Sequence, residues 1–156
     1  MTNNYSAAIW EAIENFLQLD DWKYETHEDH GAISCGVSLK SKAKSAKIWF
    51  NVKKDGFTIL SILPFSADDD TKAAAAEFIT RANYGMVHGN FEMDFNDGEI
   101  RFKTTHFAGE TVPAYEQIRF LLYLNVIAME RYSDALMKVI FGMADPAEAV
   151  KAVEEK

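Results

Sequence analysis

The sequence predicts an α+β fold in which helices pack against an antiparallel sheet. Three observations support this class. A helical apolar period opens the chain, alternating segments with two Asp–Gly dipeptides follow, and long helical patterns end it. The predicted order of elements is α-β-β-β-α-β-β-α, in a single domain that spans residues 1–156.

The composition is that of a globular protein, since 48% of the 156 residues are hydrophobic and 13% are aromatic. A formal net charge of −8 disfavours nucleic acid as a partner, because phosphates repel an acidic chain. The start lacks the pattern of a signal peptide, and the most apolar run, residues 120–129, is too short to span a bilayer. We therefore expect a soluble, cytoplasmic protein that binds neither nucleic acid nor a membrane.

Residues 5–19 carry the pattern of an amphipathic helix, and Asn4 or Ser6 is placed to cap its start. Residues 22–29 alternate, and strands are predicted over 32–39, 47–54 and 57–65. The last two form a hairpin with Asp55–Gly56 as a two-residue type I′ turn, because glycine tolerates the positive φ that this turn requires. Pro64 is expected to close this group of strands.

Residues 89–105 form a second predicted hairpin, with Asp97–Gly98 as its turn. Apolar side chains then face one another on one side and opposite charges on the other. The predicted pairs are Phe95–Ile100, Met93–Phe102, Phe91–Thr104, Asp94–Arg101 and Glu92–Lys103. Because each carboxylate has a basic partner that keeps it ionised, we interpret these charges as scaffold and not as catalytic groups.

Three further helical segments are predicted. Residues 66–85 are rich in alanine and begin with Asp68–Asp70, which suit a helix N-terminus. Residues 113–142 form either one long helix or a pair with a break near Ser133, and Pro113 suits the first turn. A short final helix starts at Asp145 as N-cap, with Pro146 at its first position.

Several polar residues have structural explanations that we prefer to a site. His27 and His30 bracket a turn, and His88 and His106 fall on opposite faces of the second hairpin in the register above. Cys35 lies on the apolar face of its strand and suits a buried position. Four lysines are interpreted as protection of a sheet edge, with a phosphate or acidic-partner patch as the alternative: Lys40, Lys42, Lys44 and Lys47. No metal, cofactor or catalytic residue is predicted.

Both faces of the first hairpin are apolar, and the long helix is apolar nearly all round. Either helices cover both faces of the sheet, or one face contacts another protein, and we favour the second explanation. The residues predicted to contact a partner are Trp49, Leu60, Ile62, Phe120 and Leu124.

Two stretches of the chain resemble the YbjN family of small bacterial proteins, which are labelled sensory transduction regulators. Residues 81–102 carry Asn83, Gly89, Phe91, Glu92, Asp94, Gly98, Glu99 and Arg101, and residues 125–150 carry Asn125, Tyr132, Gly142, Pro146 and Ala149. The N-terminal half agrees in element order alone. The resemblance implies a fold like that of type III secretion chaperones, in a dimeric module without established ligand or catalytic residues.

We therefore predict a non-catalytic protein-interaction module, a chaperone-like protein or a regulatory adaptor, that forms a homodimer and holds a protein client. The alternative is a domain that senses a small molecule or a divalent metal through residues 27–30 or 68–70.

Overall fold

The computed structural model describes residues 3–156 and forms one six-stranded antiparallel sheet with helices packed against it. The strand order is β1-β2-β3-β4-β6-β5. The elements are α1 (Ala7–Leu19), β1 (Tyr24–His27), the 3₁₀ turn η1 (Glu28–His30), β2 (Ala32–Ser38), β3 (Ser45–Val52), β4 (Gly56–Ser66), α2 (Lys72–Asn83), β5 (Asn90–Met93), β6 (Glu99–Phe107), α3 (Tyr115–Ile140) and α4 (Pro146–Glu154).

The α+β class is confirmed. The observed order differs from the predicted one in two ways: four strands precede α2 where three were predicted, and the short terminal helix α4 is a separate element after α3. The additional strand is β1, which has four residues and lies at the edge of the sheet. It lies within residues 22–29, whose alternation is noted above but which the predicted order of elements leaves out.

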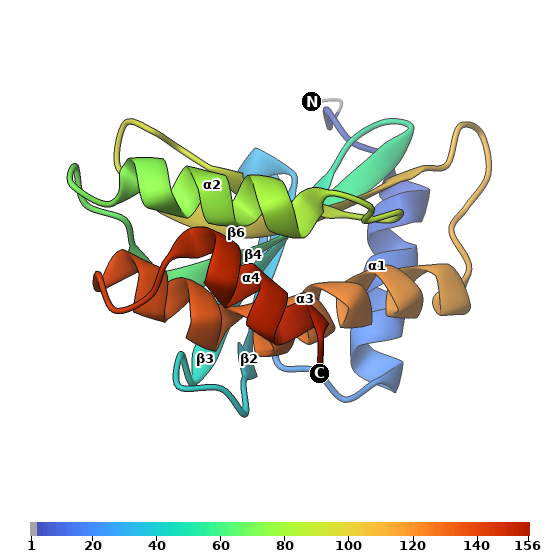
Figure 1. Cartoon of the computed structure of the whole chain (residues 1–156). Helices are drawn as coiled ribbons and strands as arrows, with labels where there is room; N and C mark the ends of the chain where they lie inside the picture. The colour runs from blue at the N-terminus through green and yellow to red at the C-terminus, as the bar shows by residue number, and fades with distance from the viewer. Residues whose placement is uncertain (1–2) are drawn as a thin grey trace.

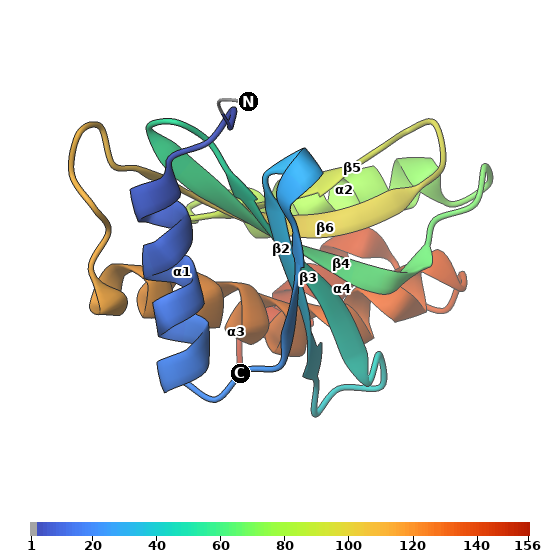
Figure 2. The same cartoon turned by 180° about the vertical axis from the view of Figure 1, so that it is seen from behind.

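The helices cover one face of the sheet. Helices α2, α3 and α4 lie in front of the strands in Figure 1, whereas the reverse view in Figure 2 leaves β2, β3 and β4 in front. One apolar cluster packs α1 and the first half of α3 against side chains such as Phe50, and a second packs α2, α4 and the rest of α3 against side chains such as Phe102. The explanation that helices cover both faces is therefore wrong.

Helix α3 is a single helix of 26 residues, which settles the question of a break near Ser133. Ser133 is buried inside it, with its Oγ 2.8 Å from the Oγ of Ser41. The N-cap of α3 is Ala114, so Pro113 precedes the helix instead of occupying the first turn. Among the described residues, none of the helices combines the length and the apolar character that a membrane span requires.

The helix caps are partly as predicted. Ser6 caps α1 and Asp145 caps α4, each by accepting a hydrogen bond from a backbone N–H three residues on. Helix α2 begins at Lys72, later than predicted, and Asp68 lies in the preceding turn, where its carboxylate accepts from the N–H of Thr71 at 2.9 Å.

The first hairpin turns one residue earlier than predicted. The N–H of Lys53 donates to the carbonyl of Gly56, so Lys54 and Asp55 form the turn. Gly56 instead lies in β4, where a Cβ atom would overlap the carbonyl oxygen of His106 in β6. The strand also continues beyond Pro64 to Ser66, with an irregularity in its pairing that accommodates the proline.

The predicted register of the second hairpin is also wrong. Glu92 lies opposite Arg101 and Met93 opposite Ile100, so residues 95–98 form a longer turn and Phe95 is exposed. Because side chains alternate with a period of two, a shift of two positions keeps every residue on its predicted face. Side-chain hydrogen bonds of Asp94 and Asp97 to backbone N–H groups stabilise the longer turn.

Candidate functional site

The five residues predicted to contact a partner lie on two separate surfaces. Trp49, Leu60 and Ile62 share the sheet face that none of the helices in the described part of the chain covers, which we call the open sheet face. Phe120 and Leu124 lie on α3, which packs against the opposite face. The structure therefore brings three of these residues together and separates them from the other two.

On the open sheet face, an apolar row runs across the central strands. Trp49 lies opposite Leu60, and Ile62 lies between Lys47 and Arg101 in the neighbouring strands. Leu60 is only 8% exposed although it belongs to neither apolar cluster of the core. We attribute this burial to its neighbours across the strands, so Trp49 and Ile62 are the accessible part of the row.

Polar side chains surround this row. The ring of His27 lies 5.0 Å from that of Trp49, and the Nζ of Lys47 lies 5.5 Å from the same ring. On the other side Arg101 and Lys103 both donate to the carboxylate of Glu92, at 3.0 and 2.9 Å. The arrangement combines an apolar centre with a charged rim.

Glu92 is held as an anion by this contact. Partial burial raises the pKa of its carboxyl group, but the hydrogen bonds from Lys103 and Arg101 outweigh that effect and hold the pKa below its usual range. An ionised carboxylate bound to two cations at neutral pH does not transfer protons readily. The geometry therefore supports the interpretation of these charges as scaffold. The predicted pair Glu92–Lys103 is present, whereas Arg101 pairs with Glu92 and not with Asp94.

The second surface is the outer side of α3, which we call the α3 stripe: Glu116, Phe120, Leu124, Ile127, Arg131 and Lys138. Phe120 is 49% exposed and Ile127 is 57% exposed, with half-buried Leu124 between them. Sequence reasoning identified Phe120 and Leu124 but missed Ile127 and Arg131, although the spacing of seven residues from Phe120 to Ile127 was a usable signal.

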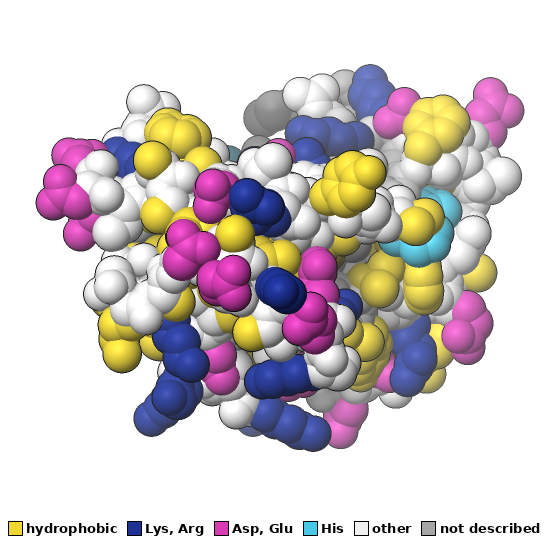
Figure 3. All heavy atoms as spheres, viewed as in Figure 1, with side chains coloured by type: hydrophobic (Ala, Val, Ile, Leu, Met, Phe, Trp, Pro, Cys, Tyr) yellow, Lys and Arg dark blue, Asp and Glu magenta, His cyan; other side chains and the backbone are white. Residues whose placement is uncertain are grey.

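A cavity of about 190 Å³ lies beside the stripe. Leu124, Ile127 and Arg131 line it from α3, and the segment 86–89 lines it from the side of β5. In that segment Val87 is 84% exposed, and the ring of His88 lies 5.1 Å from that of Phe120. Figure 3 shows apolar side chains gathered around a histidine on this side of the molecule.

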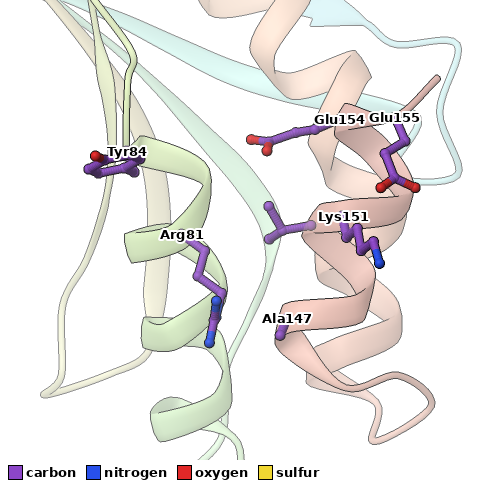
Figure 4. Close-up of a pocket in the computed structure, with 7 residues that line it drawn as sticks. Arg81, Tyr84, Ala147, Lys151, Glu154 and Glu155 are labelled. Carbon is purple, nitrogen blue, oxygen red and sulfur yellow. The ribbon is translucent and has the colours of Figure 1, made fainter.

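A second hollow lies between α2 and α4 (Figure 4), with a volume of about 390 Å³. Side chains of both charges line it, among them Arg81, Lys151 and Glu154. Two of these already have partners, since Arg81 pairs with Glu77 at 3.7 Å and Glu154 accepts from the hydroxyl of Tyr132 at 3.2 Å. This mixture indicates no particular ligand.

The polar clusters of the sequence have partners within the protein. The Nε2 of His27 lies 2.9 Å from the Oγ of Ser34, and Asp69 pairs with Lys72 at 2.7 Å. His88 packs on α3, whereas His106 packs against Phe57 of β4. Within residues 3–156, histidine, cysteine and acidic side chains nowhere gather in a group of three that suits a metal ion.

The lysine cluster does not protect a sheet edge. It lies in and beside the connection between β2 and β3, which are interior strands, whereas the edges are β1 and β5. Carboxylates of α3 hold this connection, because Glu130 accepts from the N–H of Lys40 at 3.3 Å and Asp134 from that of Lys42 at 2.7 Å. The lysine side chains are exposed.

Cys35 is buried on the helical face of β2, and burial raises the pKa of its thiol to about 12. An unfolded cysteine has a pKa of about 8.5, so we expect the native thiol to react with DTNB at pH 8 more slowly than the unfolded one, by a factor on the order of a thousand. Absorbance measurements of the native protein and of protein in urea test this. Equal rates would show that Cys35 is accessible.

Comparisons with known proteins agree with this fold. The family model YbjN, described as a "putative bacterial sensory transduction regulator", matches residues 10–138. The crystal structure of YbjN, a putative transcription regulator from E. coli, is similar with a TM-score of 0.54 and 10% sequence identity, over 85% of this chain and 89% of that one. No curated protein matches the chain.

Proposed function

The chain belongs to the YbjN family, and on that premise we propose that it is a regulatory protein-interaction module without catalytic activity, which forms a homodimer and holds a protein client. The description of the family as a sensory transduction regulator, and of the E. coli protein as a transcription regulator, supports a regulatory role. The chaperone-like or adaptor role, in which a client is held, rests on one observation, the apolar row of the open sheet face.

This row is unusual for a sheet with one face in water. Such a face normally carries polar side chains that alternate with the apolar residues of the core. Here Trp49 and Ile62 occupy its centre, and no helix within residues 3–156 covers them. Large aromatic side chains at the centre of a surface contribute most to protein–protein affinity when a partner excludes water from them.

The rim indicates the chemistry of the client. Lys47, Arg101 and Lys103 lie beside the row, and Glu92 neutralises part of the charge of the last two. Lys47 contacts the ring of Trp49 and remains exposed. A client surface with apolar side chains at its centre and a carboxylate at its edge is complementary to this arrangement.

The test is a comparison of Trp49→Lys with a matched control, Leu19→Lys. Leu19 is 76% exposed at the end of α1, away from the open sheet face, so both changes place a lysine at an exposed apolar position. We expect Trp49→Lys to weaken binding of a client by about 30-fold or more, because central aromatic anchors contribute at least 2 kcal/mol. Leu19→Lys should bind like the wild type.

The measurement begins with tagged protein in native lysate, identification of the client by mass spectrometry, and titration of the purified client by calorimetry. Circular dichroism establishes that both variants are folded, and Ile62→Lys provides a second substitution on the same row. Unchanged affinity in folded Trp49→Lys and Ile62→Lys would refute the open sheet face as the client site.

A further inference from the structure

We propose that the α3 stripe is the surface through which two copies of this chain pair, with their α3 helices antiparallel and a two-fold axis at Ile127. The inference rests on the proposed function, because it specifies the interface of the homodimer. It uses a surface separate from the open sheet face, so each of the two proposals can fail alone.

Phe120 and Ile127, the two exposed apolar residues of the stripe, belong to neither apolar cluster of the core, whereas Leu124 packs partly against one of them. Two turns of helix separate Phe120 from Ile127, so they lie on nearly the same side of α3. The core residues of α3, such as Ile118, Asn125 and Met129, lie on the opposite side. Half of the surface of Phe120 and more than half of that of Ile127 therefore remain in water in a single copy.

The charges of the stripe are self-complementary in one orientation. Glu116 lies eleven residues before Ile127 (127 − 116) and Lys138 lies eleven residues after it (138 − 127), and both are exposed. In an antiparallel pair centred on Ile127, Glu116 of each copy therefore lies opposite Lys138 of the other. A parallel pair would instead place like charges together, which is unfavourable.

The centre of the stripe suits the same arrangement. Ile127 meets its own counterpart at the axis, as a two-fold interface requires. The cavity lined by Leu124, Ile127 and Arg131 opens beside this central part, where the other copy brings an exposed Ile127. The cavity of about 190 Å³ is the space that such an aliphatic side chain would fill.

Analytical ultracentrifugation at about 1 to 100 µM tests the proposal. We expect the wild type to dimerise, and Ile127→Asp to weaken the dimer by about 100-fold or more, since it places two carboxylates at the axis. Ile127 is 57% exposed, so the variant should fold normally. Trp49→Lys is the control and should dimerise like the wild type.

Charge exchange tests the register. Glu116→Lys and Lys138→Glu should each weaken the dimer by about tenfold, because each variant brings like charges together. The double variant should regain the affinity of the wild type. A mixture of the two single variants should form a heterodimer. In that heterodimer, residue 116 of each copy lies opposite a residue 138 of opposite charge.

Three results would overturn the inference. They are a wild type that stays monomeric throughout the concentration range, a dimer that Ile127→Asp leaves unchanged, and a double charge variant that does not recover. If a monomeric wild type still captures a client through Trp49, the inference fails while the client-binding part of the proposed function stands. If Ile127→Asp abolishes client capture by a monomer, the stripe binds the client and not a second copy.

Discussion

Replacing Gly98 with alanine is expected to lower the free energy of unfolding by about 2–5 kcal/mol, from a strained backbone and a steric clash together. Gly98 has φ +77°, a conformation that side chains with a Cβ atom rarely adopt. Its Cβ atom would also overlap the carbonyl oxygen of Ala67, and the N–H of Ala67 donates to the carbonyl of Gly98 at 2.9 Å. The substitution would therefore separate the turn from the end of β4.

Gly85→Ala is the matched control for this prediction. Gly85 has φ +87°, but no atom lies within 4 Å of the position of a Cβ atom there. We expect a loss of about 1 kcal/mol at this site, from the backbone conformation alone. Urea unfolding followed by circular dichroism measures both variants, and losses of equal size would show that the contact with Ala67 contributes little.

Replacing Asn125 with leucine is expected to lower the free energy of unfolding by about 2–4 kcal/mol, because it leaves buried polar groups without partners. Asn125 is fully buried between α3 and the sheet. Its Oδ1 accepts from the hydroxyl of Ser61 at 2.8 Å, and its Nδ2 donates to the hydroxyl of Thr104 at 2.7 Å and to the carbonyl of Leu121 at 2.9 Å. Leucine is similar in size but makes none of these bonds.

The triple variant Ser61→Ala/Thr104→Val/Asn125→Leu separates lost hydrogen bonds from altered packing. Removing the polar partners together can be nearly neutral, so we expect the triple variant to recover at least about 1 kcal/mol of the loss. Urea unfolding at pH 7 measures the single and triple variants side by side. A triple variant less stable than Asn125→Leu would show that packing, and not unsatisfied polar groups, causes the destabilisation.

The hydrogen bonds of Asn125 also help to keep the α3 stripe and the open sheet face on opposite sides of the molecule. Ser61 lies in β4, Thr104 in β6 and Asn125 in the middle of α3, so their hydrogen bonds define how α3 lies across the sheet. Hydrogen bonds are directional, whereas apolar contacts allow one helix to slide along another. The network therefore orients α3 with Asn125 toward the sheet and the α3 stripe toward solvent.

The sequence predicted the faces of the strands more reliably than their pairing. In both hairpins the partners differ by two positions from the predicted ones, yet Phe50 and Phe102 face the helices as their alternation indicates. A shift of two residues preserves alternation, so the apolar pattern cannot distinguish the two registers. Hydrogen bonds within the turns decided between them, and those depend on backbone geometry.

The prediction of contact residues had a similar limit. Trp49, Leu60 and Ile62 are apolar residues on the strand face where a one-sided sheet would carry polar side chains. Phe120 and Leu124 belong to a helix that has more apolar positions than one buried face needs. Local periodicity contains that information, because it states which side chains share a face. It contains nothing about what covers the face.

The sequence by itself thus determined the α+β class, the faces of the strands and the apolar residues in excess of what one core needs. Only the tertiary structure decided that helices α1 to α4 lie on one face of the sheet and that the excess residues form two surfaces. The physical reason is that burial arises where elements remote in sequence meet, and the period of a single strand or helix does not specify which remote element it meets.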